Sequence, residues 1–190
     1  MRIGLFFGSF NPVHTGHMII ASYLANHTDL QRVWLVVSPQ NPFKKKESLA
    51  NDYARLDLVR TAIGDTPYLS ACDIEFRLPQ PSYTVDTLAY LTEKHPEHEF
   101  ALIMGGDSLC SLPKWKNPEA ILNNHRIYVY KRPGHDLGPL ADHPSVHIIS
   151  GTPQMELSAT FIRECLRNGK SVRYFVPDAV YEELLKRRIY

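Results

Sequence analysis

The sequence has almost no excess of charge and few cysteines. Its 21 lysines and arginines are balanced by 20 aspartates and glutamates, for a net charge of +1. Such a chain has no broad basic face of the kind that binds nucleic acid. The 3 cysteines lie far apart and form no Cys-x-x-Cys pair. This spacing argues against a disulfide framework or a cysteine zinc site and fits a reducing cytosol.

Long hydrophobic runs are also missing. No run approaches the ~20 apolar residues of a membrane-spanning helix, and no charged-then-apolar leader opens the chain. The 190 residues, 44% of them hydrophobic, are enough for one domain with a buried core. We find no internal repeat and no dividing linker, so we expect a single cytoplasmic domain over residues 1–190.

The most informative stretch, residues 8–17, reads Gly-Ser-Phe-Asn-Pro-Val-His-Thr-Gly-His. An apolar run typical of a buried strand precedes it at 3–7, and a helical pattern follows at 18–25. A turn from strand to helix presents free backbone N–H groups and the positive end of a helix dipole, which together suit an anion. Gly8 and Gly16 have no Cβ, so a ligand can approach the backbone closely.

Two histidines of this stretch, His14 and His17, are three residues apart. At the start of a helix this spacing places both imidazoles on about the same side. An imidazole can donate a hydrogen bond to a phosphate oxygen or carry positive charge there. For an isolated His-x-x-His pair, one capping and one packed histidine is the alternative interpretation.

The rest of the chain alternates between predicted strands and predicted helices. Strands are predicted at 32–38, 68–70, 99–104, 126–131 and 146–150, and helices at 53–63, 82–94, 158–168 and 177–188. The expected helix caps are Asn51 or Asp52, Ser82 or Thr84, and Ser158. This order predicts an α/β fold with a doubly wound, mostly parallel sheet whose active site lies at the carboxyl ends of the strands.

A second strong pattern is Leu157-Ser-Ala-Thr-Phe-Ile-Arg163. The hydroxyls of Ser158 and Thr160 and the guanidinium of Arg163 would gather at the positive end of a helix, where phosphate binds well. A capped surface helix is the alternative.

A third pattern follows the strand at 99–104. Gly106 and Asp107 come just past the strand, at the ligand edge of such a sheet, and Trp115 stands eight residues after Asp107. Trp115 could instead be a core aromatic residue. Upstream, Thr84 and Asp86 could be ordinary capping residues in the first turn of a helix.

Together these patterns resemble the nucleotidyltransferase superfamily, and within it the bacterial nicotinate-nucleotide adenylyltransferase family. The shared elements are Gly-Ser-Phe-Asn-Pro-x-His-x-Gly-His, Ser-Tyr-Thr-x-Asp-Thr-Leu, Gly-x-Asp-x-Leu with Leu-x-x-Trp, and Ser-x-Thr-x-x-Arg. The resemblance therefore covers most of the chain. The family usually has Asp in place of Asn11, His in place of Phe43 and Ser in place of Ala159, and often Gly in place of Phe7.

The resemblance implies a Rossmann-like fold and transfer of the adenylyl group of ATP to nicotinate mononucleotide, with release of pyrophosphate. It implies catalytic roles for His14, His17, Lys44 and Arg163. It implies that ATP is bound by Gly8, Ser9, Phe10, His14, Gly16, His17, Ser158, Thr160 and Arg163. The acceptor would be bound by Tyr83, Thr84, Gly106, Asp107 and Trp115, whose indole would stack on the pyridine ring.

The expected mechanism is direct in-line attack, because no Ser, Cys or His is paired with an evident base that would make it a covalent nucleophile. Mg²⁺ is expected to arrive with ATP, since no carboxylate cluster suggests a metal cage. Three alternatives remain open: an adenylyltransferase for another phosphorylated acceptor (nicotinamide mononucleotide or phosphopantetheine), a cytidylyltransferase, or a non-catalytic ATP sensor on the same fold.

Overall fold

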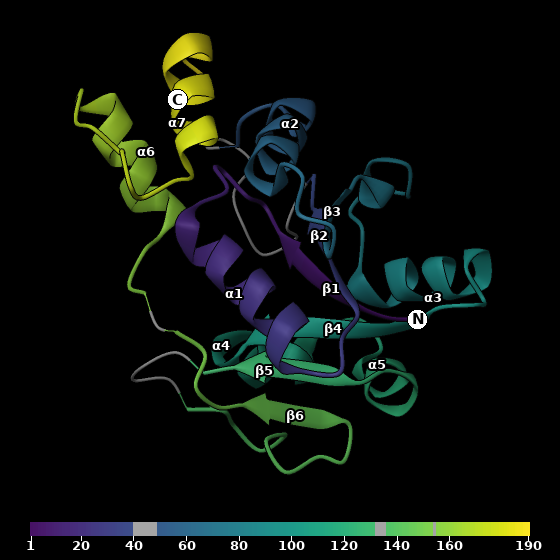
Figure 1. Ribbon diagram of the computed structural model, residues 1–190. Coiled ribbons are helices and arrows are strands. Elements are labelled where there is room, and N and C mark those ends of the chain that lie inside the picture. The colour runs from purple at the N-terminus through teal and green to yellow at the C-terminus, as the bar shows by residue number, and fades with distance from the viewer. Residues whose placement is uncertain (40–48, 132–135, 154) are drawn as a thin grey trace.

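The computed structural model describes residues 1–39, 49–131, 136–153 and 155–190 (Figure 1). Within them lies a six-stranded, all-parallel sheet with the strand order β3-β2-β1-β4-β5-β6. The strands are β1 (Arg2–Gly8), β2 (Arg32–Val37), β3 (Leu69–Cys72), β4 (Glu99–Gly105), β5 (Ile127–Tyr130) and β6 (Val146–Ile149). The predicted doubly wound sheet is therefore confirmed.

Helices connect and flank these strands. They are α1 (Thr15–His27), α2 (Asp52–Ile63), α3 (Thr84–Lys94), α4 (Gly106–Ser111), α5 (Pro118–Asn124), α6 (Ala159–Arg167) and α7 (Asp178–Arg187), with short 3-10 turns η2 (Ile74–Phe76) and η3 (Leu112–Lys114). Figure 1 shows α6 and α7 beside α2 and the start of α1. No helix in the described ranges has the length and apolar character needed to cross a membrane.

Side chains of each strand alternate between two cores, one on each face of the sheet. On β4, Phe100 and Leu102 pack into the core under α3, α4 and α5, while Ile103 packs into the core under α1, α2, α6 and α7. Because both faces are covered, the central strands are apolar throughout rather than alternating with polar residues. This is why the sequence shows them as continuous hydrophobic runs.

Two of the three predicted helix caps are confirmed. The Asn51 side chain accepts hydrogen bonds from the first N–H groups of α2, and Ser158 accepts one from the Phe161 N–H of α6 at 3.2 Å. The prediction for α3 was wrong. Tyr83 occupies the cap position without a side-chain bond, and Thr84 is the first helical residue.

The order of connections reverses at β1. From β1 the chain goes outward to β2 and β3, then returns to the other side of β1 with β4 and continues to β5 and β6. In open α/β sheets, ligands bind at the carboxyl ends of the strands on either side of such a reversal. The loops after β1 and β4 are therefore expected to carry the site.

A buried arginine binds the backbone directly after β1 and directly after β2. Arg55, on α2, is fully buried, and its guanidinium donates to the carbonyl oxygens of Ser9, Ser38 (2.9 Å) and Ala50 (3.1 Å). Asp52, one turn earlier on α2, accepts from the same guanidinium at 2.6 Å. A buried cation is tolerated only when it is paired and hydrogen-bonded in this way.

We predict that Arg55→Met lowers the free energy of unfolding by about 3–5 kcal/mol, the cost of leaving buried polar partners unpaired. Urea or guanidinium unfolding of both proteins measures this difference.

Arg60→Met is the matched control, because Arg60 lies on the same helix with its side chain 58% exposed and pairs with Asp57 at 3.6 Å. A surface pair of this kind contributes under about 1 kcal/mol. Equal losses of stability in the two variants would contradict the role given to Arg55.

Candidate functional site

The side chain of Phe10 is buried beneath the loop between β1 and α1 and packs against it. This residue has a positive φ of 43° and is 1% exposed, with its ring 4.9 Å from the ring of His17. A Cβ on Gly8 would lie 2.9 Å from the end of the Phe10 ring. Gly8 therefore leaves space for the Phe10 ring. Because this ring is buried against His17, it could contribute to nucleotide binding only indirectly, by supporting His17.

The two histidines stack on each other at the start of α1, with ring centroids 3.6 Å apart. The backbone N–H of His14 donates to Nδ1 of His17 at 3.2 Å. Because Nδ1 of His17 accepts, the proton of the neutral imidazole lies on Nε2, which becomes a donor. A Cβ on Gly16 would lie 3.1 Å from Nδ1 of His14, so this glycine leaves space for the first histidine.

Asn11, which replaces the family's usual aspartate, still links the loop to its surroundings. Its Oδ1 accepts a hydrogen bond from the Ala50 N–H at 3.1 Å, just before α2. A carboxylate oxygen could accept the same bond. The substitution therefore preserves a contact between the loop and α2.

The second predicted motif lies against the first. Arg163 reaches from α6 to the β1–α1 loop, where its Nη1 donates to the Asn11 carbonyl oxygen at 2.8 Å. Its Nη2 donates to Oγ1 of Thr160 at 3.2 Å. The structure therefore brings the histidines, Thr160 and Arg163 to one end of the sheet, as the sequence predicted.

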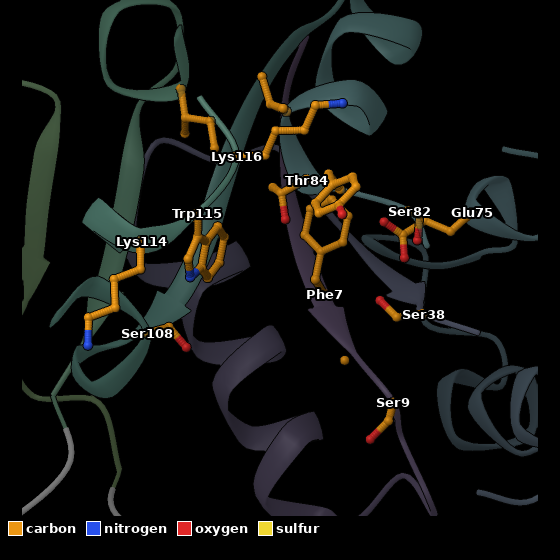
Figure 2. A pocket seen from close by; sticks show the side chains of 14 residues that line it. Phe7, Ser9, Ser38, Glu75, Ser82, Thr84, Ser108, Lys114, Trp115 and Lys116 are labelled. Atoms are coloured by element: carbon orange, nitrogen blue, oxygen red, sulfur yellow. The ribbon is translucent and has the colours of Figure 1, made fainter. Parts of the chain in front are cut away.

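A pocket opens at the carboxyl end of β1, on the side away from the histidines and Arg163 (Figure 2). It is lined by Phe7, Gly8, Ser9, Ser38, Glu75, Ser82, Tyr83, Thr84, Val85, Ser108, Lys114, Trp115, Lys116 and Ile121. In Figure 2, Trp115 and Phe7 lie on facing sides with the Thr84 hydroxyl between them. We call the space between the Trp115 and Phe7 rings the aromatic slot. Two aromatic walls with a hydroxyl between them suit a flat ligand ring that carries a polar substituent.

Trp115 both packs and lines the pocket. Its indole N–H donates to Oγ of Ser111 at 3.1 Å, and the ring lies against the core under α3, α4 and α5. It stays half-buried rather than fully enclosed, so one part of the ring faces the pocket. Both interpretations of this tryptophan therefore apply.

Glu75, which no sequence motif marks, lies in the wall of the pocket. It is 3% exposed and accepts a hydrogen bond from Oγ1 of Thr87 at 2.9 Å. Burial raises the pKa of this carboxyl, and the hydrogen bond from Thr87 partly opposes the rise. Its position in the short turn η2 has no periodicity that would mark it from sequence.

Lys116 also lines the pocket and was missed. Its ammonium lies 2.7 Å from Oδ2 of Asp86, in the first turn of α3, and 4.9 Å from the ring centroid of Tyr83. Its position directly after Trp115 in the sequence is the one feature that could have indicated a place in the pocket wall.

Not every predicted site residue lines this pocket. Tyr83, Thr84 and Trp115 do, whereas Gly106 and Asp107 lie outside it and Ser108 takes their place. Gly8 and Ser9 lie in the pocket wall, at the start of the loop that carries the histidines. Lys44 falls within 40–48, outside the described residues, so its role stays a prediction. Among the residues that the structure describes, no three His, Cys, Asp or Glu side chains are grouped so as to hold a metal ion.

The comparisons with known proteins agree with this geometry. Residues 5–165 match the family model described as cytidylyltransferase-like, so fold and site define a nucleotidyltransferase. The chain is 50% identical over 190 residues to a probable nicotinate-nucleotide adenylyltransferase of Cytophaga hutchinsonii, covering 100% of this chain and 98% of that protein. It is 53% identical over 184 residues to one of Flavobacterium psychrophilum, covering 96% of this chain and 95% of that protein.

The fold also matches solved structures. A Plasmodium falciparum nicotinic acid mononucleotide adenylyltransferase complexed with APC superposes with a TM-score of 0.81 at 18% identity, covering 100% of this chain and 96% of that one. The same enzyme complexed with NaAD superposes with a TM-score of 0.81 at 17% identity, covering 100% and 97%. By its close relatives, the chain belongs to the nicotinate-nucleotide adenylyltransferase family.

We predict that His17→Ala lowers kcat by about a hundredfold or more, the scale for losing one stabilising donor at a reacting phosphate. The fold should survive, because the His17 side chain is only partly buried. Turnover at saturating substrates, with far-ultraviolet circular dichroism as a folding check, measures this.

His27→Ala is the control for that substitution, since His27 is an exposed histidine at the opposite end of α1, stacked on Tyr23. It should retain full turnover. A folded His17→Ala protein as active as the His27→Ala protein would exclude a phosphate-binding role for His17.

Arg163→Lys should be damaging although the charge is kept. A guanidinium can donate to the Asn11 carbonyl and to Thr160 and still present further N–H groups, whereas one ammonium cannot span that fork. We expect kcat/KM for ATP to fall by about tenfold or more.

The matched variant is Arg167→Lys, at an exposed position in the last turn of the same helix. It should behave as the unmodified protein. If Arg163→Lys also matches the unmodified protein at limiting and saturating ATP, then α6 is only a capped surface helix.

Proposed function

We propose that the chain transfers the adenylyl group of ATP to the phosphate of nicotinate mononucleotide, giving nicotinate adenine dinucleotide and pyrophosphate. The observation that carries this proposal is the placement of two different half-sites on either side of the β1 carboxyl end. One is the anion-binding end made by the histidines and Arg163. The other is the aromatic slot between Phe7 and Trp115. Gly8 and Ser9 connect the two.

In this mechanism the phosphate of the acceptor attacks the α-phosphorus of ATP directly. A phosphate monoester is already ionised near neutral pH, so the step needs no general base. Catalysis then rests on alignment of the two substrates and on stabilisation of charge at the phosphates. Burial raises the pKa of the Cys72 thiol to about 11, so this thiol stays protonated at neutral pH and is a poor nucleophile.

Several parts of the proposal rest on chemistry rather than on contacts. Mg²⁺ would enter bound to the phosphate oxygens of ATP, which supply the hard ligands that it prefers. Lys44 would reach the triphosphate from the loop after β2. A reducing, cytoplasmic setting suits 3 cysteines that are all free.

The test is pyrophosphate release from ATP with a panel of acceptors. We predict turnover with nicotinate mononucleotide, and a kcat/KM at least about a hundredfold lower with nicotinamide mononucleotide. The first N–H groups of α3, which begins at Thr84 in the pocket wall, suit a carboxylate. The NH₂ of an amide has no lone pair for them, so pocket donors would be left unpaired.

The same panel separates the alternatives. Turnover with phosphopantetheine in place of either mononucleotide would reassign the acceptor, and turnover with CTP in place of ATP would reassign the donor. ATP binding without pyrophosphate release from any acceptor would indicate a sensor. Equal use of the acid and the amide would contradict the argument from helix N–H groups while leaving the ATP half of the proposal in place.

A further inference from the structure

A buried carboxyl group joins two parts of the pocket wall. Oγ1 of Thr87, on α3, donates a hydrogen bond of 2.9 Å to Oε1 of Glu75, in the turn η2. Both side chains are buried, with exposures of 0% for Thr87 and 3% for Glu75. Among the described residues that line the pocket, Glu75 is the one acidic side chain. The bond therefore ties α3 to the segment that brings this carboxyl group to the pocket.

The segment between η2 and α3 is held by a second side chain. Nε2 of Gln80 donates to the Glu75 carbonyl oxygen at 2.7 Å and to the Leu78 carbonyl oxygen at 3.2 Å. The backbone of Glu75 is thus held by the loop that leads into α3, while its side chain is held by α3 itself. The turn, the loop and the start of the helix form one hydrogen-bonded unit.

The start of α3 lies in the pocket wall and has no side-chain cap. Tyr83 occupies the cap position without a side-chain hydrogen bond, and Tyr83, Thr84 and Val85 all line the pocket. Thr87 is not among the lining residues. Its bond to Glu75 thus holds the first turn of the helix from outside the pocket.

The Thr87 hydroxyl has two acceptors within reach. Its oxygen also lies 3.3 Å from the Tyr83 carbonyl oxygen, but a hydroxyl carries one proton and makes its best bond to one acceptor at a time. The bond to Glu75 is the shorter of the two, and it is charge-assisted when the carboxyl is ionised. The carboxylate therefore sets the direction of this hydroxyl.

Glu75 also binds a hydroxyl from a third element. Burial raises the pKa of the Glu75 carboxyl, and hydrogen bonds from Ser38 and Thr87 oppose the rise. Ser38 directly follows β2, and Figure 2 shows it on the same side of the pocket as Glu75, opposite Trp115. A carboxylate can accept from several hydroxyls at once, because both of its oxygens are acceptors. One group thus links the end of β2, η2 and α3 beside the pocket.

We propose that Glu75 is a positioning residue for the acceptor, which through Thr87 holds the start of α3 in place against the end of β2. This inference rests on the proposed function and deepens it by naming a side chain that shapes the acceptor half of the site from behind its lining. Loss of the bond between Thr87 and Glu75 should weaken acceptor binding and leave ATP binding unchanged, because the two histidines and Arg163 belong to α1 and α6.

The experiment measures KM and kcat with nicotinate mononucleotide and ATP in Thr87→Val. This change removes the hydroxyl with little change of shape, and it leaves every residue that lines the pocket in place. We expect the KM for the acceptor to rise about tenfold, the scale for one charge-assisted hydrogen bond. The kcat and the KM for ATP should stay within about twofold of the unmodified protein.

Thr87→Ser separates positioning from packing. This variant keeps the hydroxyl and loses the methyl group, so the KM for the acceptor should stay within about threefold of the unmodified protein. If Thr87 only fills space, the order of the two variants reverses, because Thr87→Ser leaves a cavity and Thr87→Val does not. That reversed order would overturn the proposal.

A double-mutant cycle tests Glu75 itself. In Glu75→Met the side chain keeps a similar length but has no oxygen, and the KM for the acceptor should rise. If the two residues act through one bond, the double variant should be no worse than the more damaging single variant. Effects that multiply would show independent roles and would overturn the assignment. Circular dichroism checks each fold, and Glu75→Met carries the test if Thr87→Val does not fold.

Thr92→Val is the matched control, because Thr92 lies on the same helix at an exposed position. It should behave as the unmodified protein in kcat and in both KM values.

The inference and the proposed function fail in different ways. If the unmodified protein uses nicotinate mononucleotide and a folded Thr87→Val protein has the same KM for it, Glu75 is not a positioning residue and the proposed function stands. If the unmodified protein does not use nicotinate mononucleotide, the proposed function fails and the inference fails with it.

Discussion

The geometry of the site depends on one buried guanidinium. Arg55 donates to backbone carbonyls after β1 and after β2, the two strands whose loops were predicted to approach the triphosphate. Without such a donor, carbonyl groups buried between the loops and α2 would be unpaired, which proteins rarely tolerate. Asp52 compensates the charge from the first turn of the same helix. The carbonyl groups of Ser9 and Ser38, directly after the two strands, are thereby held from α2.

Neighbouring residues of one strand serve the two halves of the site. At the end of β1, Phe7 belongs to the face covered by α3 and lines the pocket proposed for the acceptor, while Phe6 packs on the opposite face against Phe10 and His17. The alternation of side chains along a strand makes this division unavoidable. A family position that often holds glycine carries Phe7 here, which adds an aromatic wall to the slot.

The sequence predicted the elements whose signals are local. Apolar runs located the strands, and Asn51 and Ser158 located two helix starts. The structure brings together the two motifs that were predicted to bind phosphate. What it missed depends on tertiary structure. Nothing local distinguishes the buried Arg55 from the exposed Arg60 on the same helix. Glu75 and Lys116 acquire their roles from partners 12 and 30 residues away.

The contact between Arg163 and the Asn11 carbonyl joins residues 152 positions apart. Such a contact cannot form within a local segment, because it needs the tertiary fold to bring the two residues together. The end of the sheet predicted to bind the phosphates thus exists only when the β1–α1 loop and α6 are docked together. A nucleotide bound there acts as a non-covalent cross-link between distant parts of the chain. By mass action, its binding free energy adds to the stability of the entire fold rather than to that of a single loop.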